Sequence, residues 1–437
     1  GVLERIISDD FEHHSTRASL RLRTPQGPIQ VHLPNNDAST RLNHRVRVSG
    51  VRLRDRIAAS ESVVLAEEPD ATTQICTTFG QQNVAVILVN MPSRTLPAGV
   101  TAASVQAGFA GASPYAADTA SANGFIRLIS YGQTYVTASA YGPFTLSQDY
   151  TCDDYDNLAT AAIAAADSTV DFSQFTRIAF IFPVSACYTY AGLGTVGCSS
   201  ATSPSKGQLT TALTWFPVSP SQSGVDVRIY AHELGHNLGL DHSKSDDFGA
   251  SPIGPLGVLG TEVEYGDVFS NMGPLNGHWV SQQKVSLGWM TLGDYKEVLT
   301  PGAYTLVPFE SSGLRALRVL RDPSAAEWFW LEYRQPIDPV DSAILYTNGP
   351  GALVHFEDPL HYDNASFLLD FNPSSTPNDF GDASLSAGRT WSDPYSPLTI
   401  TVGASNASGL PVTIAYDTPC ATLQATANTF ATSAAAG

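Results

Sequence analysis

The chain has 437 residues, of which 43% are hydrophobic and 15% are charged. This composition supports a sizeable core, excludes wholesale disorder, and the length allows two or three domains. The net charge is −18, and residues 1–70 contribute nothing to it, because they hold ten Arg and ten Asp or Glu. The acidic main body argues against nucleic acid or an anionic membrane as a partner. No run of 18 apolar residues is present, so no transmembrane segment is expected.

The first 70 residues predict a small β-rich module. Short segments of β-forming residues alternate with Pro, Gly and Asn turns, which is typical of a compact barrel or sandwich, and an OB-like barrel is one candidate. Arginines striped over such a barrel are one signature of oligonucleotide binding, but the acids between them favour a solvated face. The expected strands cover residues 19–24, 29–33, 45–53 and 62–67.

In the rest of the chain, the predicted pattern of strands and helices changes once. From about 80 to 245, buried strands (84–90 and 177–183) interleave with helical stretches (117–130 and 157–167), which predicts an α/β layer. From about 300 onward, short strands between Pro, Gly, Asn and Asp loops predict a β-sandwich. We therefore expect a multidomain α+β protein, divided into a barrel-like N-terminal module (1–75), an α/β domain (76–300), a C-terminal sandwich (301–420) and a flexible tail (421–437).

The segment "AHELGHNLGLDH" (231–242) carries the strongest chemical signal. The chain has only ten His, and three lie within these positions. On a helix, His232 and His236 project from one face a single turn apart, so one ion can take both imidazoles. Gly239 tolerates positive φ and ends the helix, so the chain can turn back and bring His242 to the same ion.

Three neutral His with one open position is the ligand set of catalytic rather than structural zinc. The alternative is an amphipathic helix whose His are polar surface or satisfied core residues, but the five fixed positions of HExxHxxGxxH favour a metal site. Glu233, next to the first ligand, reaches a water on the ion without binding the metal. We expect Glu233 to act as general base on a zinc-activated water.

The pattern resembles the metzincin clan of zinc endopeptidases, whose members carry a Met-containing turn beneath the three His. Met272, in "EYGDVFSNMGPLNGHW" (264–279), matches that turn. This segment and the upstream segment "CYTYAGLGTVG" (187–197) look most like the gametolysin family, whose members are secreted or cell-wall-associated. Ser243 after the third His makes a matrixin-like relative the second choice. The resemblance covers roughly residues 84–290 and implies a secreted endopeptidase of extracellular or cell-wall proteins.

One position departs from related enzymes. Astacin- and serralysin-like enzymes place a Tyr two residues after the Met to assist the transition state, and here that position is Pro274. Tyr265 and His278 are candidate replacements, although a structural role is favoured for both. The oxyanion-stabilising residue is therefore unassigned.

The five cysteines give no CxxC pair, which argues against a cysteine-built zinc site. Cys187 and Cys198, in a Gly-rich loop, are expected to pair, and Cys152 and Cys420 would then tie the α/β domain to the sandwich. That leaves Cys76, but other pairings stay open. In a secreted chain the odd count leaves one thiol over. Two sequons (364–366 and 406–408) fit an extracellular protein.

Cys76 is also a candidate latency ligand. A Cys just before a metzincin domain resembles the cysteine switch, in which a propeptide thiolate fills the open zinc position, and residues 1–80 would then be a propeptide domain. The surrounding "TQICTTFG" lacks the Arg and Gly neighbours of the matrixin switch. A different disulfide arrangement or a buried thiol remains the alternative.

Two other readings stay open. A cell-wall or carbohydrate-binding protein with a non-catalytic metal site would use Trp residues to stack on sugars, although aromatics alternating along a strand favour core packing; the candidates are Trp328, Trp330 and Trp391. Ca²⁺ is considered for acidic clusters, but no EF-hand spacing is present, and solvated loops are favoured. These clusters are Asp153, Asp154 and Asp156, and Asp379 and Asp382. The expected partner is a protein or peptide substrate, and the oligomeric state is open.

Overall fold

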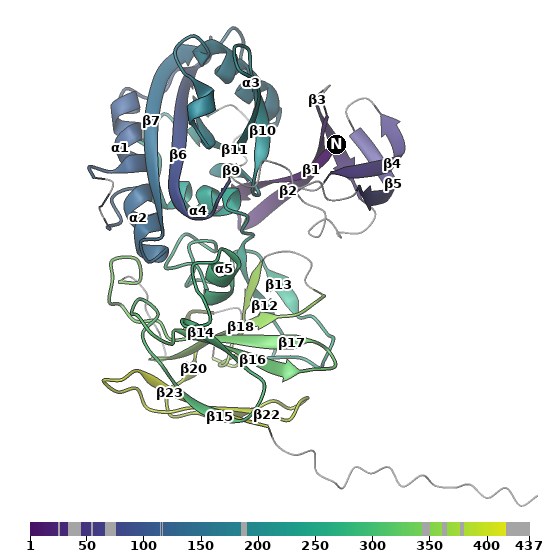
Figure 1. The fold of residues 1–437 in the computed structure, drawn as a ribbon, viewed down its shortest axis with the longest axis vertical. Helices are drawn as coiled ribbons and strands as arrows, with labels where there is room; N and C mark the ends of the chain where they lie inside the picture. The colour runs from purple at the N-terminus through teal and green to yellow at the C-terminus, as the bar shows by residue number, and fades with distance from the viewer. Residues whose placement is uncertain are drawn as a thin grey trace, which may run out of the picture.

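The computed structural model places the described residues in three β-sheets, one of which carries most of the helices (Figure 1). This mostly β architecture with few helices is compatible with a multidomain α+β protein. The tail expected over 421–437 lies outside the described residues. The described residues are 1–24, 27–33, 45–53, 56–65, 76–113, 115, 117–184, 190–342, 350–360, 365–375 and 380–416.

Five N-terminal strands form one end of a sheet that has eleven strands among the described residues. They are β1 (Val2–Asp10), β2 (Ser15–Thr24), β3 (Gly27–His32), β4 (Val46–Leu53) and β5 (Arg56–Val64). They pair in the order β1-β2-β3-β5-β4, and a bridge between Val2 and Arg45 brings the chain before β4 back to β1. The strands surround a small core of Leu3, Leu22, Ile29, Val31 and Val46.

The other half of this sheet is a helix-covered α/β layer. From β1 outward it runs β9 (Gly192–Thr195), β11 (Gly207–Val218), β8 (Arg177–Pro183), β6 (Gly80–Asn90) and β7 (Thr134–Thr145), with β10 (Ser199–Ser203) on β11. Strands β11, β8, β6 and β7 are parallel neighbours, and every residue of β8 is buried, as expected for a strand covered on both faces.

Helices cover both faces of this layer. Alternate residues of β6 pack either with α1 (Ala102–Ala110), α2 (Ala122–Ile129) and α4 (Val227–Asn237), or with α3 (Tyr155–Ala166). Because side chains alternate across a strand, one continuous apolar run in β6 supplies both cores. Helix α4, which carries the histidine segment, therefore rests on a rigid sheet.

The C-terminal region contains two sheets packed on a shared core. The first runs β13 (Thr261–Val263), β12 (Ser243–Asp247), β19 (Ser366–Leu368), β18 (Gly351–Glu357), β17 (Glu327–Glu332), β16 (Ala316–Asp322) and β14 (Tyr295–Val298), with β20 (Leu385–Ser386) on β18. The second runs β15 (Gly302–Leu306), β23 (Leu410–Tyr416), β22 (Leu398–Val402) and β21 (Thr390–Ser392). The short helix α5 (Ser281–Ser286) lies between these sheets and the α/β layer (Figure 1).

The expected division at residue 300 does not coincide with a sheet boundary. Strand β12, which begins directly after His242, pairs in parallel with β19, so Ser243 lies opposite Ser366. The chain thus enters the C-terminal sheet immediately after the histidine segment. The domain limits themselves stay a prediction.

Most expected elements are confirmed where the local pattern is strong. Residues 84–90 and 177–183 lie in β6 and β8, and the two expected helices correspond to α2 and α3. The sequence pattern did not identify β1, α1 or the strands between 192 and 218. Among the described helices, none combines the length and apolar composition that crossing a membrane would take.

Arg177 at the start of β8 offers a test of core energetics. Its side chain is buried, has no hydrogen-bond partner among the described residues, and burial lowers its pKa to about 10. Because an unpartnered buried charge opposes folding, Arg177→Met should raise the free energy of unfolding by about 1–3 kcal/mol, measured by urea denaturation. Arg177→Gln, which keeps a polar group there, should gain less. A loss of stability in Arg177→Met would contradict this account.

Candidate metal centre

Helix α4 holds the first two histidines one turn apart. Its N-cap is Asp226, whose carboxylate accepts from the backbone N–H of Arg228. The helix ends at Asn237, and Gly239 follows at φ 103°, a conformation that favours glycine. The predicted turn at Gly239 is therefore confirmed.

The turn returns His242 to the first two histidines. The Nε2 atoms of His236 and His242 lie 3.2 Å apart, and all three imidazoles are buried. The predicted convergence of His232, His236 and His242 is present in the structure.

A fourth group, which sequence reasoning missed, completes the cluster. Asp9, near the end of β1, places Oδ1 2.8 Å from His242 Nε2. Its Oδ2 lies 3.3 Å from His236 Nε2 and 3.6 Å from His232 Nε2. One ligand atom from each of the four residues lies within 4.8 Å of the others. We call Asp9, His232, His236 and His242 the metal cluster.

The outer nitrogen of each imidazole already has a partner. The Nδ1 of His232 lies 2.7 Å from the carbonyl oxygen of Asn271, and that of His236 lies 2.9 Å from the carbonyl oxygen of Leu240. The Nδ1 of His242 contacts the carboxylate of Glu264. A proton on each Nδ1 donates to these oxygens, which leaves each Nε2 lone pair directed at the cluster centre.

This arrangement fits zinc. Two nitrogens bound to one tetrahedral zinc at about 2.0–2.1 Å lie about 3.3 Å apart, close to the 3.2 Å between the Nε2 atoms of His236 and His242. His232 Nε2 and Asp9 Oδ2 are buried and have no hydrogen-bond partner among the described residues, and a shared cation would supply one. Three imidazoles and a carboxylate are also ligands that zinc prefers.

The electrostatics of the cluster call for a positive charge at its centre. Burial lowers the pKa of His232 to about 3, so this imidazole stays neutral and able to bind metal. Burial also lowers the pKa of His242, but the carboxylates of Asp9 and Glu264 outweigh it and raise that pKa to about 10. A divalent cation would supply the positive charge that this proton otherwise provides.

Glu233 lies beside the cluster, and both of its carboxylate oxygens are buried without a hydrogen-bond partner in the described part of the chain. Burial and the neighbouring Asp9 carboxylate raise the pKa of Glu233 well above its usual value. Gly192 and Gly194 of β9 make room for it, because a Cβ at either position would collide with its carboxylate. With a metal held by the cluster, Glu233 would be placed to exchange a proton with a group bound to it.

Met272 packs against helix α4, which carries His232 and His236. It is fully buried, and a Cβ on Gly235 of α4 would overlap its sulfur. The backbone on either side of it also serves the cluster: the Asn271 carbonyl oxygen orients His232, and the Met272 carbonyl oxygen accepts from Ser243 N–H at 2.9 Å.

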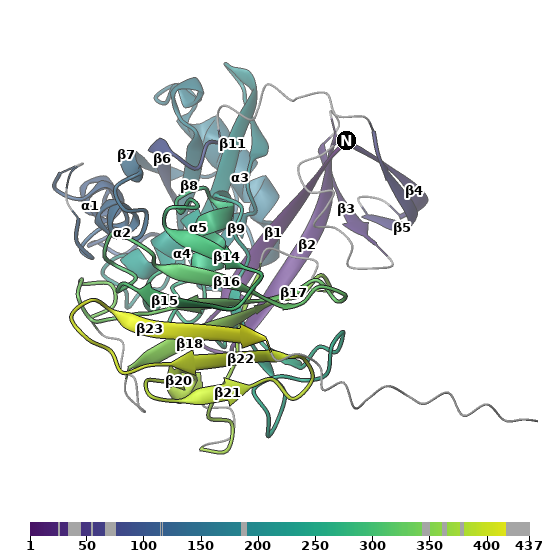
Figure 2. The ribbon, with the colours of Figure 1, turned by 60° about the horizontal axis from the view of Figure 1, so that its bottom comes forward.

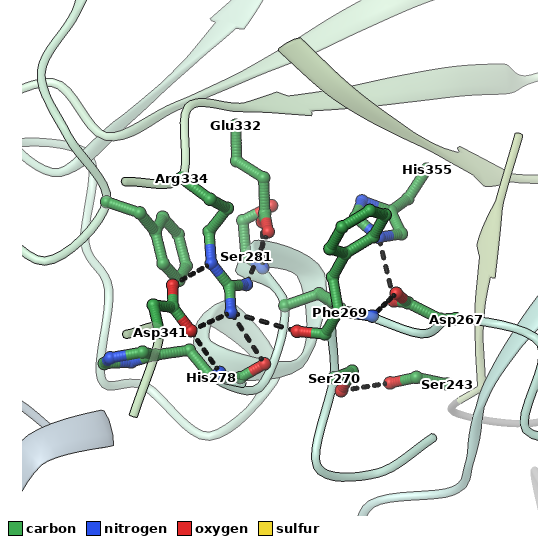
Figure 3. Close-up of polar contacts among 12 residues, drawn as sticks. Ser243, Asp267, Phe269, Ser270, His278, Ser281, Glu332, Arg334, Asp341 and His355 are labelled. Atoms are coloured by element: carbon green, nitrogen blue, oxygen red, sulfur yellow. Dashed lines mark hydrogen bonds and ion pairs between the residues drawn. The ribbon is translucent and has the colours of Figure 1, made fainter. Parts of the chain in front are cut away.

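The C-terminal region braces the loop that leads to Met272 (Figure 3). Arg334, just after β17, donates to the carbonyl oxygens of Phe269 and His278 at 3.0 and 3.3 Å. Its charge is balanced by Asp341 at 2.5 Å and Glu332 at 2.9 Å.

Two further contacts complete this support. His355 of β18 lies 3.0 Å from the Asp267 carboxylate, which accepts from Phe269 N–H. Ser270 Oγ accepts from Ser243 Oγ at 2.8 Å and from Met272 N–H at 3.2 Å. The strands of the C-terminal sheet thus help to hold the Met272 loop.

The latency prediction for Cys76 is corrected by the structure. Cys76 forms a disulfide with Cys198, with Cα atoms 5.7 Å apart, so it has no thiolate to offer a metal. The expected Cys187–Cys198 pair is wrong for the same reason. Cys187, Cys420 and the side chain of Cys152 lie outside what the structure describes.

Tyr265 and His278 have different surroundings. The Tyr265 hydroxyl donates to Asp9 Oδ1 at 2.8 Å, and its ring centroid lies 4.6 Å from that of His242, so Tyr265 belongs to the site. His278 instead contacts Asp338 and Lys284 in the bracing region.

The acidic residues considered for Ca²⁺ have other partners. Asp153 pairs with Arg17, and Asp156 contacts Arg21, while Asp154 accepts from Asn157. Asp379 lies outside the described residues. Over the described part of the chain, the metal cluster is the one group whose geometry suits an ion.

The bracing region gives a second prediction. In Arg334→Met, the buried carboxylates of Glu332 and Asp341 lose their counter-charge, which should cost about 3–5 kcal/mol of unfolding free energy. Arg318→Met, which breaks the more exposed pairs with Glu297 and Glu357, serves as control and should cost about 1 kcal/mol. Urea denaturation followed by tryptophan fluorescence measures both. Equal losses in the two variants would contradict the bracing role.

Comparison with known families agrees with the geometry. Residues 115–259 match the model of a family described as metallo-peptidase family M12B, reprolysin-like. The matched range includes α4 and all three histidines, and it ends before Met272. No curated protein matches the chain. The family match therefore supports a metzincin-like metallopeptidase, without pointing to the gametolysin family in particular.

Proposed function

We propose that this chain is a secreted zinc-dependent endopeptidase of extracellular or cell-wall proteins. His232, His236 and His242 would hold the zinc, and Glu233 would act as general base. The observation that carries this proposal is the convergence of three Nε2 atoms whose Nδ1 partners are already fixed. The M12B reprolysin-like match across the same histidines supports it.

The mechanism follows from the residues around the cluster. Zinc, when bound, would lower the pKa of a water molecule and polarise the scissile carbonyl. Glu233 would accept a proton from the attacking water and would later deliver it to the leaving amine nitrogen. Its burial and raised pKa suit the second step, because a protonated carboxyl must persist until the amine departs. The Asn271 carbonyl oxygen orients His232, and Met272 packs against Gly235 of α4.

The compartment and the subtype of the enzyme are supported by separate observations. The Cys76–Cys198 disulfide supports an oxidising, extracellular compartment. The gametolysin-like subtype rests on the motifs around Met272 and on "CYTYAGLGTVG", while the family match names a reprolysin-like group. The motif resemblance and the family match agree on a metzincin zinc endopeptidase.

The binding-protein alternative is less well supported by its own residues. Trp330 is buried and donates to Glu357 at 2.5 Å, and Trp391 packs on Phe329 and Phe371. Trp328 is half-buried, and the Cζ atom of Arg318 lies 4.0 Å from the centroid of its ring. The described surroundings of these rings therefore favour packing roles over sugar stacking.

Replacing Glu233 tests the catalytic assignment. Glu233→Gln keeps the histidines, so zinc content should stay at that of the wild type, while casein hydrolysis falls about 10²–10⁴-fold because the general base is lost. Zinc is measured by atomic emission, and hydrolysis is measured after limited proteolysis, since the cluster is buried in the intact chain. Glu297→Gln, on an exposed strand, is the control.

A chelator provides the matching metal test. Dialysis against 1,10-phenanthroline should abolish hydrolysis, and added zinc should restore it. A Glu233→Gln protein that turns over casein like the wild type, or hydrolysis that survives metal removal, would refute the proposed function. Glycan binding by a zinc-free chain would favour the binding-protein alternative.

A further inference from the structure

Strand β1 occupies the edge of the α/β layer next to the metal cluster. It pairs antiparallel with β9, and the ladder runs from Ile6 opposite Thr195 to Asp9 opposite Gly192. Backbone N–H groups beyond both ends of β9 add bonds to the carbonyl oxygens of Arg5 (2.9 Å) and Asp9 (2.7 Å). Without β1, the layer would end at β9, whose free edge would face solvent.

An exposed strand edge beside a peptidase site is a place for an extended peptide. A peptide in β conformation satisfies the N–H and C=O groups of such an edge through its own backbone, whatever its side chains are. Because Gly192 and Gly194 of β9 lie against Glu233, a peptide on this edge passes directly by the general base. Strand β1 thus takes the place that a substrate would need.

The end of β1 also closes the metal cluster. Asp9 is fully buried and directs its carboxylate at three Nε2 atoms, in the position that a water or substrate oxygen requires. The three histidines and Glu233 are each at most 1% exposed, so a protein substrate has no path to them in this conformation.

Several contacts outside the cluster hold β1 in this position. Arg5 forms an ion pair with Asp241, the residue before the third histidine. The Tyr265 hydroxyl fixes Asp9, and the ring of Phe11 packs edge-on against His232 with centroids 5.0 Å apart. Placement of the Asp9 carboxylate therefore does not depend on metal alone.

The rest of the N-terminal module contacts the α/β layer through polar groups. Figures 1 and 2 show β1 and β2 extending as one long hairpin from the module toward the layer. Ion pairs join Arg17 to Asp153 and Arg21 to Asp156. Residues of the N-terminal module and of the α/β layer together line a cleft of about 720 Å³. A polar, incompletely packed contact is typical of domains that can separate.

We propose that residues 1–65 are an autoinhibitory segment: β1 occupies the substrate edge of β9, and the Asp9 carboxylate fills the fourth zinc position. This inference rests on the proposed function. It assigns latency to a carboxylate on a strand of the module, in place of the Cys76 thiolate. Activation then requires β1 to leave β9, after which the same edge accepts an extended peptide.

Metal spectroscopy of the intact chain tests the role of Asp9. The full-length wild type, Asp9→Asn and Asp9→Ala are loaded with Co²⁺, and visible absorption is followed as acetohydroxamate, a small metal-binding probe, is added. The wild-type spectrum should hardly respond, whereas both variants should change and bind the probe at least about tenfold more tightly. Release of zinc to a chelator should be about 10–100-fold faster in both variants.

Asp10→Asn is the matched control, because the Asp10 carboxylate accepts from His13 and not from the cluster. It should behave as the wild type does in both measurements. Asn at position 9 keeps the size of Asp, so agreement between the two Asp9 variants separates loss of the ligand from misfolding. Probe binding to wild type as tight as to Asp9→Asn would overturn the inference.

A cleavable chain tests the strand. A specific protease site placed within residues 66–75 allows the covalent link to the module to be cut in the folded, zinc-loaded protein. The cut wild type should be inactive when concentrated and gain activity on dilution, as the module dissociates. Cut Asp9→Asn should be active at concentrations where cut wild type is not, and Asp10→Asn should follow wild type.

The outcomes separate the two proposals. A chain that binds no zinc and hydrolyses nothing, cut or uncut, would refute the proposed function. A chain that binds zinc and is fully active before cutting would refute autoinhibition alone. Equal activity of cut wild type and cut Asp9→Asn at every concentration would also refute it.

Discussion

The structure around the metal cluster depends on one electrostatic constraint, a buried carboxylate that faces three imidazoles and a second carboxylate. Burying Asp9 beside Glu233 without a compensating cation would cost several kcal/mol, because the interior solvates charge poorly. A divalent ion at the centre removes that cost and explains why Asp9 Oδ2 and His232 Nε2 have no hydrogen-bond partner within the described ranges. Asp9 would bind such an ion, and the oxygens that accept from the three Nδ1 atoms, including that of Glu264, orient the imidazoles toward it.

This constraint also links regions that are distant in the chain. Helix α4 supplies two ligands, the turn after Gly239 supplies the third, and β1 supplies the fourth. The C-terminal sheet contributes through Arg334 and His355, which brace the loop that carries Met272. The three parts of the protein therefore act on one site, although each has its own core.

The part of the site that could be predicted from the sequence is the part encoded locally. His232 and His236 follow from helical spacing, and His242 follows from the glycine that ends the helix. Met272 needed a family resemblance as well, because one buried Met carries little information by itself. Glu264 and Asn271, which orient the imidazoles, have no local pattern that marks them.

The features that were missed depend on contacts between distant segments. Asp9 reaches the cluster because β1 pairs with β9. The residue pattern of "VLERIISDD" does not predict that pairing. Cys76 was a candidate latency ligand because of its place before the α/β domain, whereas the fold brings it to Cys198. Likewise, composition alone placed a domain division at residue 300. That division does not match the sheet, because β12 pairs in parallel with β19, which lies far along the chain.

The most direct test of this account is a crystal structure of the zinc-loaded, intact chain, with the metal located by anomalous scattering at the zinc edge. We expect one peak within about 2.0–2.2 Å of the Nε2 atoms of His232, His236 and His242 and of an Asp9 carboxylate oxygen. A peak bound by a cysteine sulfur, a peak whose fourth ligand is water while Asp9 points elsewhere, or no peak at these histidines would contradict it.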